Sequence, residues 1–153
     1  MLNKEMTEYI TYLMGAPFIK GYNLLSKNHL QIMYYGEFDE FINDKPDSNL
    51  TKEDFDSYFN ENETTKKLMV SESVRLLRQF PFLECVTIDI RENDKVKTEV
   101  HSLRSKLNEY LGYKIEDLSV NNGSWHEAFV SEYLQNPQKI DELFELIECK
   151  MRY

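Results

Sequence analysis

Cys85-Val86-Thr87-Ile88-Asp89-Ile90-Arg91 is the stretch of sequence that decides the fold. Val86, Ile88 and Ile90 alternate with residues that are mostly polar. Because successive side chains of a β-strand point to opposite faces, this alternation gives one apolar face and one more polar face. The stretch therefore predicts a strand over residues 85–91 that packs its apolar face on a core.

A long helix is predicted directly after this strand. Asn93 or Asp94 can cap its first turn, and the apolar residues after the cap recur at spacings of three and four. This stripe consists of Val96, Val100, Leu103, Leu107, Tyr110 and Leu111. Gly112 stands where a helix commonly ends in a left-handed residue. We therefore expect one helix over residues 96–111, packed on the same core as the strand.

The residues before the strand predict a central helix over residues 64–79, which Pro81 ends. Its apolar side chains cover a wide arc, so the helix should be buried on more than one side. They are Leu68, Met69, Val70, Val74, Leu76 and Leu77.

The first 35 residues predict one more helix and, after it, a hairpin or a second helix. Residues 2–13 repeat apolar side chains at helical spacing until Gly15 and Pro17. Residues 22–25 and 30–35 flank a short polar stretch, which indicates a hairpin. A helix through these same residues is the alternative.

Two helices are predicted after Gly112. Ser124 and Glu127 have the spacing of a capping box, which places a helix over residues 125–134. Asn136-Pro137 is a typical helix start, and the apolar positions after it share one face as far as Met151.

Almost all of the net charge lies in one segment. Residues 37–63 hold ten Asp and Glu, opposed only by Lys45 and Lys52, so their net charge is 2 − 10 = −8 of the −9 of the chain. Five aromatic residues are interleaved with these acids: Phe38, Phe41, Phe55, Tyr58 and Phe59. The segment predicts a short helix around Phe41, a polar turn, and a second helix that begins with a capping box of Thr51 and Asp54.

These patterns together predict an α+β fold: a helix-rich single globular domain over residues 1–153 with a small two- or three-stranded sheet. No secretory signal or apolar run of about 18 residues is present, so we expect no membrane span and a cytoplasmic location. Cys85 and Cys149 fit no redox spacing and are expected to be reduced thiols, although one disulfide between them remains an alternative.

Motifs for metals, phosphate and catalysis are incomplete. His126-Glu127 begins like a zinc-protease helix, but Val130 replaces the second His. His29 and His101 are isolated in sequence, and the acidic segment fits no calcium loop in register. We therefore expect no catalytic residues, no cofactor and no zinc or iron site, unless the three histidines converge in space. The net charge and a pI near 4.9 also argue against direct nucleic-acid binding.

The acidic segment favours a non-enzymatic interaction protein, of the inhibitor or immunity type, that docks on a basic protein surface. Carboxylates would speed the encounter, and aromatic side chains would anchor the complex. The predicted partner-binding residues are Glu37, Asp39, Glu40, Asp54, Phe55, Asp56 and Phe59. In the alternative interpretation the aromatic residues belong to the core, and the acids only keep the surface soluble.

Two other classes of function stay open. One is a helical sensor or small-molecule-binding domain with a pocket lined by Met33, Met69, Phe129 and Phe144. The other is a small enzyme whose catalytic residues come from distant parts of the chain. We rank both below the docking protein, and the enzyme last.

Overall fold

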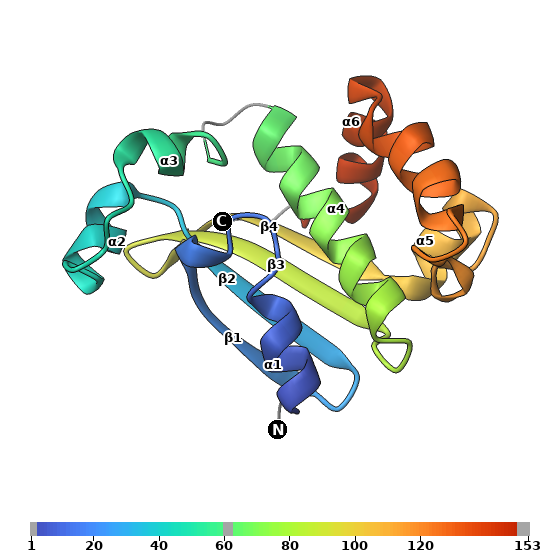
Figure 1. Cartoon of the computed structure of the whole chain (residues 1–153), viewed down its shortest axis with the longest axis horizontal. Coiled ribbons are helices and arrows are strands. Elements are labelled where there is room, and N and C mark those ends of the chain that lie inside the picture. The colour runs from blue at the N-terminus through green and yellow to red at the C-terminus, as the bar shows by residue number, and fades with distance from the viewer. Residues whose placement is uncertain (1–2, 60–62, 150–153) are drawn as a thin grey trace.

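The structure is a computed structural model that describes residues 3–59 and 63–149. Its strands form one mixed sheet in the order β1-β2-β3-β4 (Figure 1). They are β1 (Ile19–Ser26), β2 (His29–Tyr35), β3 (Cys85–Glu92) and β4 (Lys95–Leu103). β1–β2 and β3–β4 are antiparallel pairs, and the central pair β2–β3 is parallel. The α+β class is confirmed, but the sheet has four strands where two or three were predicted.

Helices cover one face of this sheet. They are α1 (Lys4–Ile10), α2 (Phe38–Asp44), α3 (Lys52–Asp56), α4 (Glu63–Gln79), α5 (Arg104–Leu111), α6 (Pro137–Ile147) and a π-helix at Trp125–Leu134. α4 packs against β3 and α6, and α6 also reaches β4. Figure 1 shows α2 and α3 at one end of the sheet, away from the other helices. The parallel pair β2–β3 needs a long crossover, and the segment with α2, α3 and α4 supplies it.

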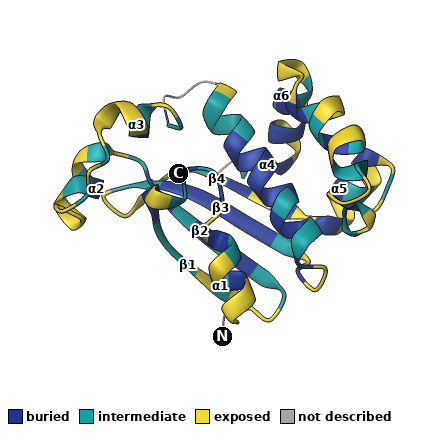
Figure 2. Ribbon diagram, viewed as in Figure 1, coloured by how far each residue is buried: buried dark blue, intermediate teal, exposed yellow. Residues whose placement is uncertain are grey.

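The core lies between the helices and the apolar face of the sheet, as the alternation in residues 85–91 predicts. Val86 and Ile88 are fully buried on β3, and so are Leu30 and Ile32 on the neighbouring β2. α4 is buried along most of its length, as its wide apolar arc predicts (Figure 2). The hairpin indicated over residues 22–35 is also confirmed, and its first strand begins at Ile19.

The long helix predicted over residues 96–111 is wrong in its first half. Asn93 (φ 51°) and Asp94 (φ 67°) form a two-residue turn, and β4 returns beside β3. Two-residue hairpin turns require left-handed residues, and Asn and Asp tolerate that conformation better than other non-glycine residues. Val100 then pairs with Ile88, and such β-branched residues favour a strand. The helix α5 begins only at Arg104.

The capping box predicted at Ser124 is also wrong. Ser124 already has helical backbone angles, and its hydroxyl accepts a hydrogen bond from the Ser119 backbone N–H (2.8 Å) instead of capping a helix. The next helix is a π-helix, whose wider turns bring Trp125 and Phe129 into a stack with ring centroids 4.9 Å apart. The guanidinium of Arg78, from α4, lies 4.4 Å from the centre of the Trp125 ring.

α6 starts as predicted, with the Asn136 side chain accepting hydrogen bonds from the first turn and Pro137 at the first helical position. It ends at Ile147, and Glu148 then pairs with Val100 on β4. Met151, the predicted end, lies outside the described residues. No helix in residues 3–59 and 63–149 combines the length and apolar character that a membrane span needs.

Candidate functional site

The two short helices of the acidic segment are held by local hydrogen bonds and by aromatic packing. In α3, the Thr51 hydroxyl accepts from the Asp54 N–H (3.2 Å), and the Asp54 carboxylate accepts from the Thr51 N–H (2.9 Å). This reciprocal pair confirms the predicted capping box. Asp54 therefore supports the start of α3.

Aromatic side chains pack α2 and α3 onto the end of the sheet. Phe18, just before β1, has ring centroids 4.8 Å from Phe41 on α2 and 5.2 Å from Phe55 on α3. Phe41 and Phe55 are 1% and 3% exposed. The interpretation of the aromatic residues as core is therefore correct for these two, and Phe55 has little surface to offer a partner. Phe59 is half-buried.

Between α2 and α3 lies a hollow of about 340 Å³, which we call the acidic hollow. Its lining residues are Gly36, Glu37, Phe38, Asp39, Lys52, Phe55, Asp56 and Phe59. Five of the seven predicted partner-binding residues belong to this set. Three phenylalanine rings, three carboxylates and one ammonium group line it, which leaves the hollow with a net charge of 1 − 3 = −2.

The ammonium group in the acidic hollow, that of Lys52, is exposed and pairs with Asp56. Lys52 Nζ lies 2.8 Å from Asp56 Oδ2, and their side chains are 71% and 44% exposed. The hydrogen bond to Asp56 raises the pKa of Lys52, so the group stays charged. An exposed ion pair of this kind contributes little to stability.

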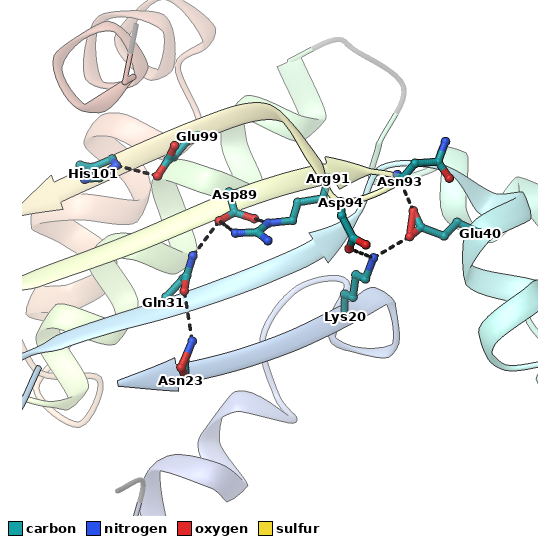
Figure 3. Close-up of polar contacts among 10 residues, drawn as sticks. All are labelled: Lys20, Asn23, Gln31, Glu40, Asp89, Arg91, Asn93, Asp94, Glu99 and His101. Carbon is teal, nitrogen blue, oxygen red and sulfur yellow. Dashed lines mark hydrogen bonds and ion pairs between the residues drawn. The ribbon is translucent and has the colours of Figure 1, made fainter. Parts of the chain in front are cut away.

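Glu40, which is also one of the predicted partner-binding residues, does not line the acidic hollow. Its carboxylate lies 2.6 Å from Lys20 Nζ on β1 and accepts from the Asn93 N–H at 2.9 Å (Figure 3). Lys20 also pairs with Asp94 at 2.7 Å. Hydrogen bonds to Asp94 and Glu40 raise the pKa of Lys20. Glu40 thus ties α2 to β1 and to the β3–β4 turn, outside the acidic hollow.

The small-molecule pocket predicted for the sensor function is assembled only in part. A hollow of about 300 Å³ is lined by Met69 and Phe144, together with Gly36, Phe59, Thr65, Lys66, Ile90, Lys97, Thr98 and Glu148. Phe129 is fully buried in the stack of the π-helix. Met33 pairs with Asp89 on β3. The Asp89 side chain lies on the polar face of the sheet.

That polar face carries a network which single-strand patterns did not reveal (Figure 3). Asp89 is fully buried and accepts hydrogen bonds from Arg91 Nε (2.9 Å) and Gln31 Nε2 (3.0 Å). Asn23 then donates to Gln31 Oε1 at 3.1 Å. The alternation in residues 85–91 predicted that one side of β3 is polar. The residues of β1 and β2 that complete the network could not be predicted, because the sequence did not show the register of these strands. Because the donors and acceptors satisfy one another, this network holds three strands together.

The three histidines do not form one cluster. His126 lies on the π-helix, 3.3 Å from the Ser131 hydroxyl. His29 and His101, by contrast, are neighbours on the polar face, with ring centroids 6.5 Å apart.

Comparison with known proteins gives no match: no protein-family model, no curated protein and no solved structure resembles this chain.

Proposed function

We propose that this protein is a non-enzymatic docking protein, of the inhibitor or immunity type, that receives an arginine or lysine side chain of a basic partner in the acidic hollow. The observation that supports this most is the combination of carboxylates and phenylalanine rings in one hollow. A cation gains from carboxylates on the rim and from the faces of aromatic rings, while its alkyl stem packs on the same rings. Arginine fits best, because its planar guanidinium both stacks on rings and pairs with two oxygens.

The molecule itself shows this arrangement of cation and rings next to the hollow. Lys45 Nζ lies 5.8 Å from the centre of the Phe41 ring and 5.9 Å from that of Tyr35. These distances are within the range of a cation–π interaction. The same end of the sheet therefore already accommodates an ammonium group over aromatic rings.

The charge of the segment would bring the partner to the hollow. Residues 37–63 carry −8 of the −9 net charge, so their field attracts a basic surface before contact and raises the association rate. We place this encounter in the cytoplasm, where free thiols such as Cys85 and Cys149 persist.

The test uses two double variants with the same net charge. Asp39→Lys/Asp56→Lys changes the hollow, and Glu109→Lys/Asp117→Lys changes two exposed acids elsewhere; both raise the net charge from −9 to −9 + 4 = −5. Asp54 is left intact because it caps α3. The probe is a hexa-arginine peptide, titrated by calorimetry at low and at moderate salt.

The hollow variant should bind the peptide at least about tenfold more weakly than the control variant, or ~1.4 kcal/mol. Wild-type affinity should fall as salt rises, because the attraction is between exposed charges. Equal affinities of the two variants would show that only net charge matters, and would refute the hollow as the docking site. Circular dichroism of each variant checks that the fold is retained.

The sensor function is the second candidate, and the hollow between α4 and α6 supports it. Its volume of about 300 Å³ lies at the lower end of the range for small-molecule sites. Lys66 there pairs with Asp141 (3.3 Å) and lies 5.4 Å from the Phe144 ring centre. A small molecule retained in native mass spectra of wild type, and lost on Met69→Trp, would favour this function over docking.

A further inference from the structure

One group of side chains on the polar side of the sheet has the composition of a metal site. Glu99 and His101 are two residues apart on β4, so both point to the same face. Cys149, which comes after α6, is held beside them because its N–H donates to the Glu99 carbonyl at 2.8 Å. The bridge between Val100 and Glu148 holds the same segment in place. One ligand atom from each of the three residues lies within 4.8 Å of the other two.

We propose that Glu99, His101 and Cys149 bind a zinc ion. A thiolate, an imidazole and a carboxylate are the donors that Zn²⁺ uses in proteins, whereas Mg²⁺ and Ca²⁺ take oxygen ligands. Zinc–ligand bonds of roughly 2.0–2.3 Å in tetrahedral geometry place ligand atoms about 3.5 Å apart. The present separations are close enough for side-chain rotation to reach that geometry, since β4 and its bridge to Glu148 already fix the backbone.

The contact between two of the ligands supports the assignment. His101 Nε2 lies 2.8 Å from Glu99 Oε1, and these are atoms that a zinc ion would bind (Figure 3). A zinc ion bound by both atoms would replace this contact. The Glu99 side chain is 15% exposed and that of His101 is 42% exposed, so the group is open to an ion from solvent.

A further histidine, His29, lies beside the group, with its ring centroid 6.5 Å from that of His101. Its Nε2 lies 2.6 Å from the Thr87 hydroxyl, which orients the ring. With three protein ligands, the fourth position of the zinc ion is left for water, as in zinc sites that remain open to other ligands.

Spacing along the sequence could not indicate this site, because Cys149 lies 48 residues after His101. The inference is also independent of the proposed function, since none of the three residues lines the acidic hollow.

The test is metal binding by protein purified without a His tag and stripped of metal. Zn²⁺ affinity is measured by competition with a chromophoric chelator, and Co²⁺ serves as a spectroscopic probe of the thiolate. The ligand variants are Cys149→Ser and His101→Ala. Cys85→Ser and His126→Ala are the matched controls, because they remove the same residue types outside the group.

Wild type and both controls should bind one equivalent of Zn²⁺ and show a thiolate-to-cobalt absorption band. Each ligand variant should lose at least about tenfold in affinity, since even outer-shell partners of a metal are worth about 10–100-fold. Cys149→Ser should also abolish the band. Because zinc binds the folded chain, it should raise the melting temperature of wild type but not of Cys149→Ser.

Binding below one equivalent would overturn the proposal, as would equal affinities in wild type and both ligand variants. In the latter case surface carboxylates such as those of residues 37–63 would be the binding groups. A cobalt band that is lost in Cys85→Ser and kept in Cys149→Ser would show that the thiolate ligand is Cys85. That result would also overturn the proposal.

Discussion

Phe55 shows how the burial of one residue depends on contacts that its neighbours in sequence do not reveal. Acids flank it on both sides, at Asp54 and Asp56, and this indicates an exposed anchor. In the structure its ring packs edge-on against Phe18, at a centroid distance of 5.2 Å, and is 3% exposed. The residue therefore contributes chiefly to stability.

Phe55→Ala should lower the free energy of unfolding by about 3–5 kcal/mol, because it removes a buried ring and leaves a cavity. Urea denaturation of wild type and variant measures the change. Tyr12→Ala is the control, since Tyr12 is 71% exposed and its truncation should cost no more than about 0.5 kcal/mol. A loss of less than ~1 kcal/mol in Phe55→Ala would contradict the placement of this ring in the core.

The β3–β4 hairpin was not predicted from the periodicity of the sequence, because the apolar residues of β4 also have helical spacing. Val96, Val100, Leu103 and Leu107 have spacings of four, three and four, which satisfy a helix. In the chain, pairing with β3 outweighs that periodicity as far as Leu103. The overlooked signal is the Asn93-Asp94 dipeptide, which suits both a helix cap and a hairpin turn, so that only the pairing of residues 95–103 decides between them.

The turn can be tested at Asp94, whose φ is 67°. Asp94→Gly and Asp94→Val both remove the ion pair to Lys20. The difference in stability between the two variants therefore reports the cost of the left-handed backbone conformation at this position. The valine variant should be less stable than the glycine variant by about 1–2 kcal/mol, because a β-branched residue is strained in the left-handed region. Chemical denaturation of the two proteins gives this difference directly. Equal stabilities would mean that residues 93–94 do not adopt this turn.

Local patterns were more successful where they describe one element at a time. The strand at residues 85–91, the helix α4 and the capping box of α3 are all confirmed, because each depends on neighbours within a few residues. The acidic hollow was predicted only as a set of residues. Its shape depends on Phe18, which lies far from α3 in sequence and holds that helix in place.

At the scale of the whole molecule, charge is unevenly distributed and should weaken the fold. The carboxylates of α2 and α3 carry charges of the same sign, and self-repulsion of like charges opposes a compact state. Sodium chloride screens it, since the Debye length falls from about 30 Å at 0.01 M to 3 Å at 1 M. We therefore expect the melting temperature of wild type to rise between low and moderate salt.

The Asp39→Lys/Asp56→Lys protein, with its net charge of −9 + 4 = −5, should show a smaller rise. Differential scanning calorimetry at several salt concentrations makes the comparison. A melting temperature that stays constant in wild type would show that the acids are too far apart, or too well solvated, to affect stability.

The stack on the π-helix has a practical consequence for monitoring these experiments. Trp125 is the only tryptophan in the chain, and its ring contacts both the guanidinium of Arg78 and the ring of Phe129. Its fluorescence therefore reports on the junction where α4 meets the π-helix. The protein thus contains its own optical probe of the packing within the helical layer.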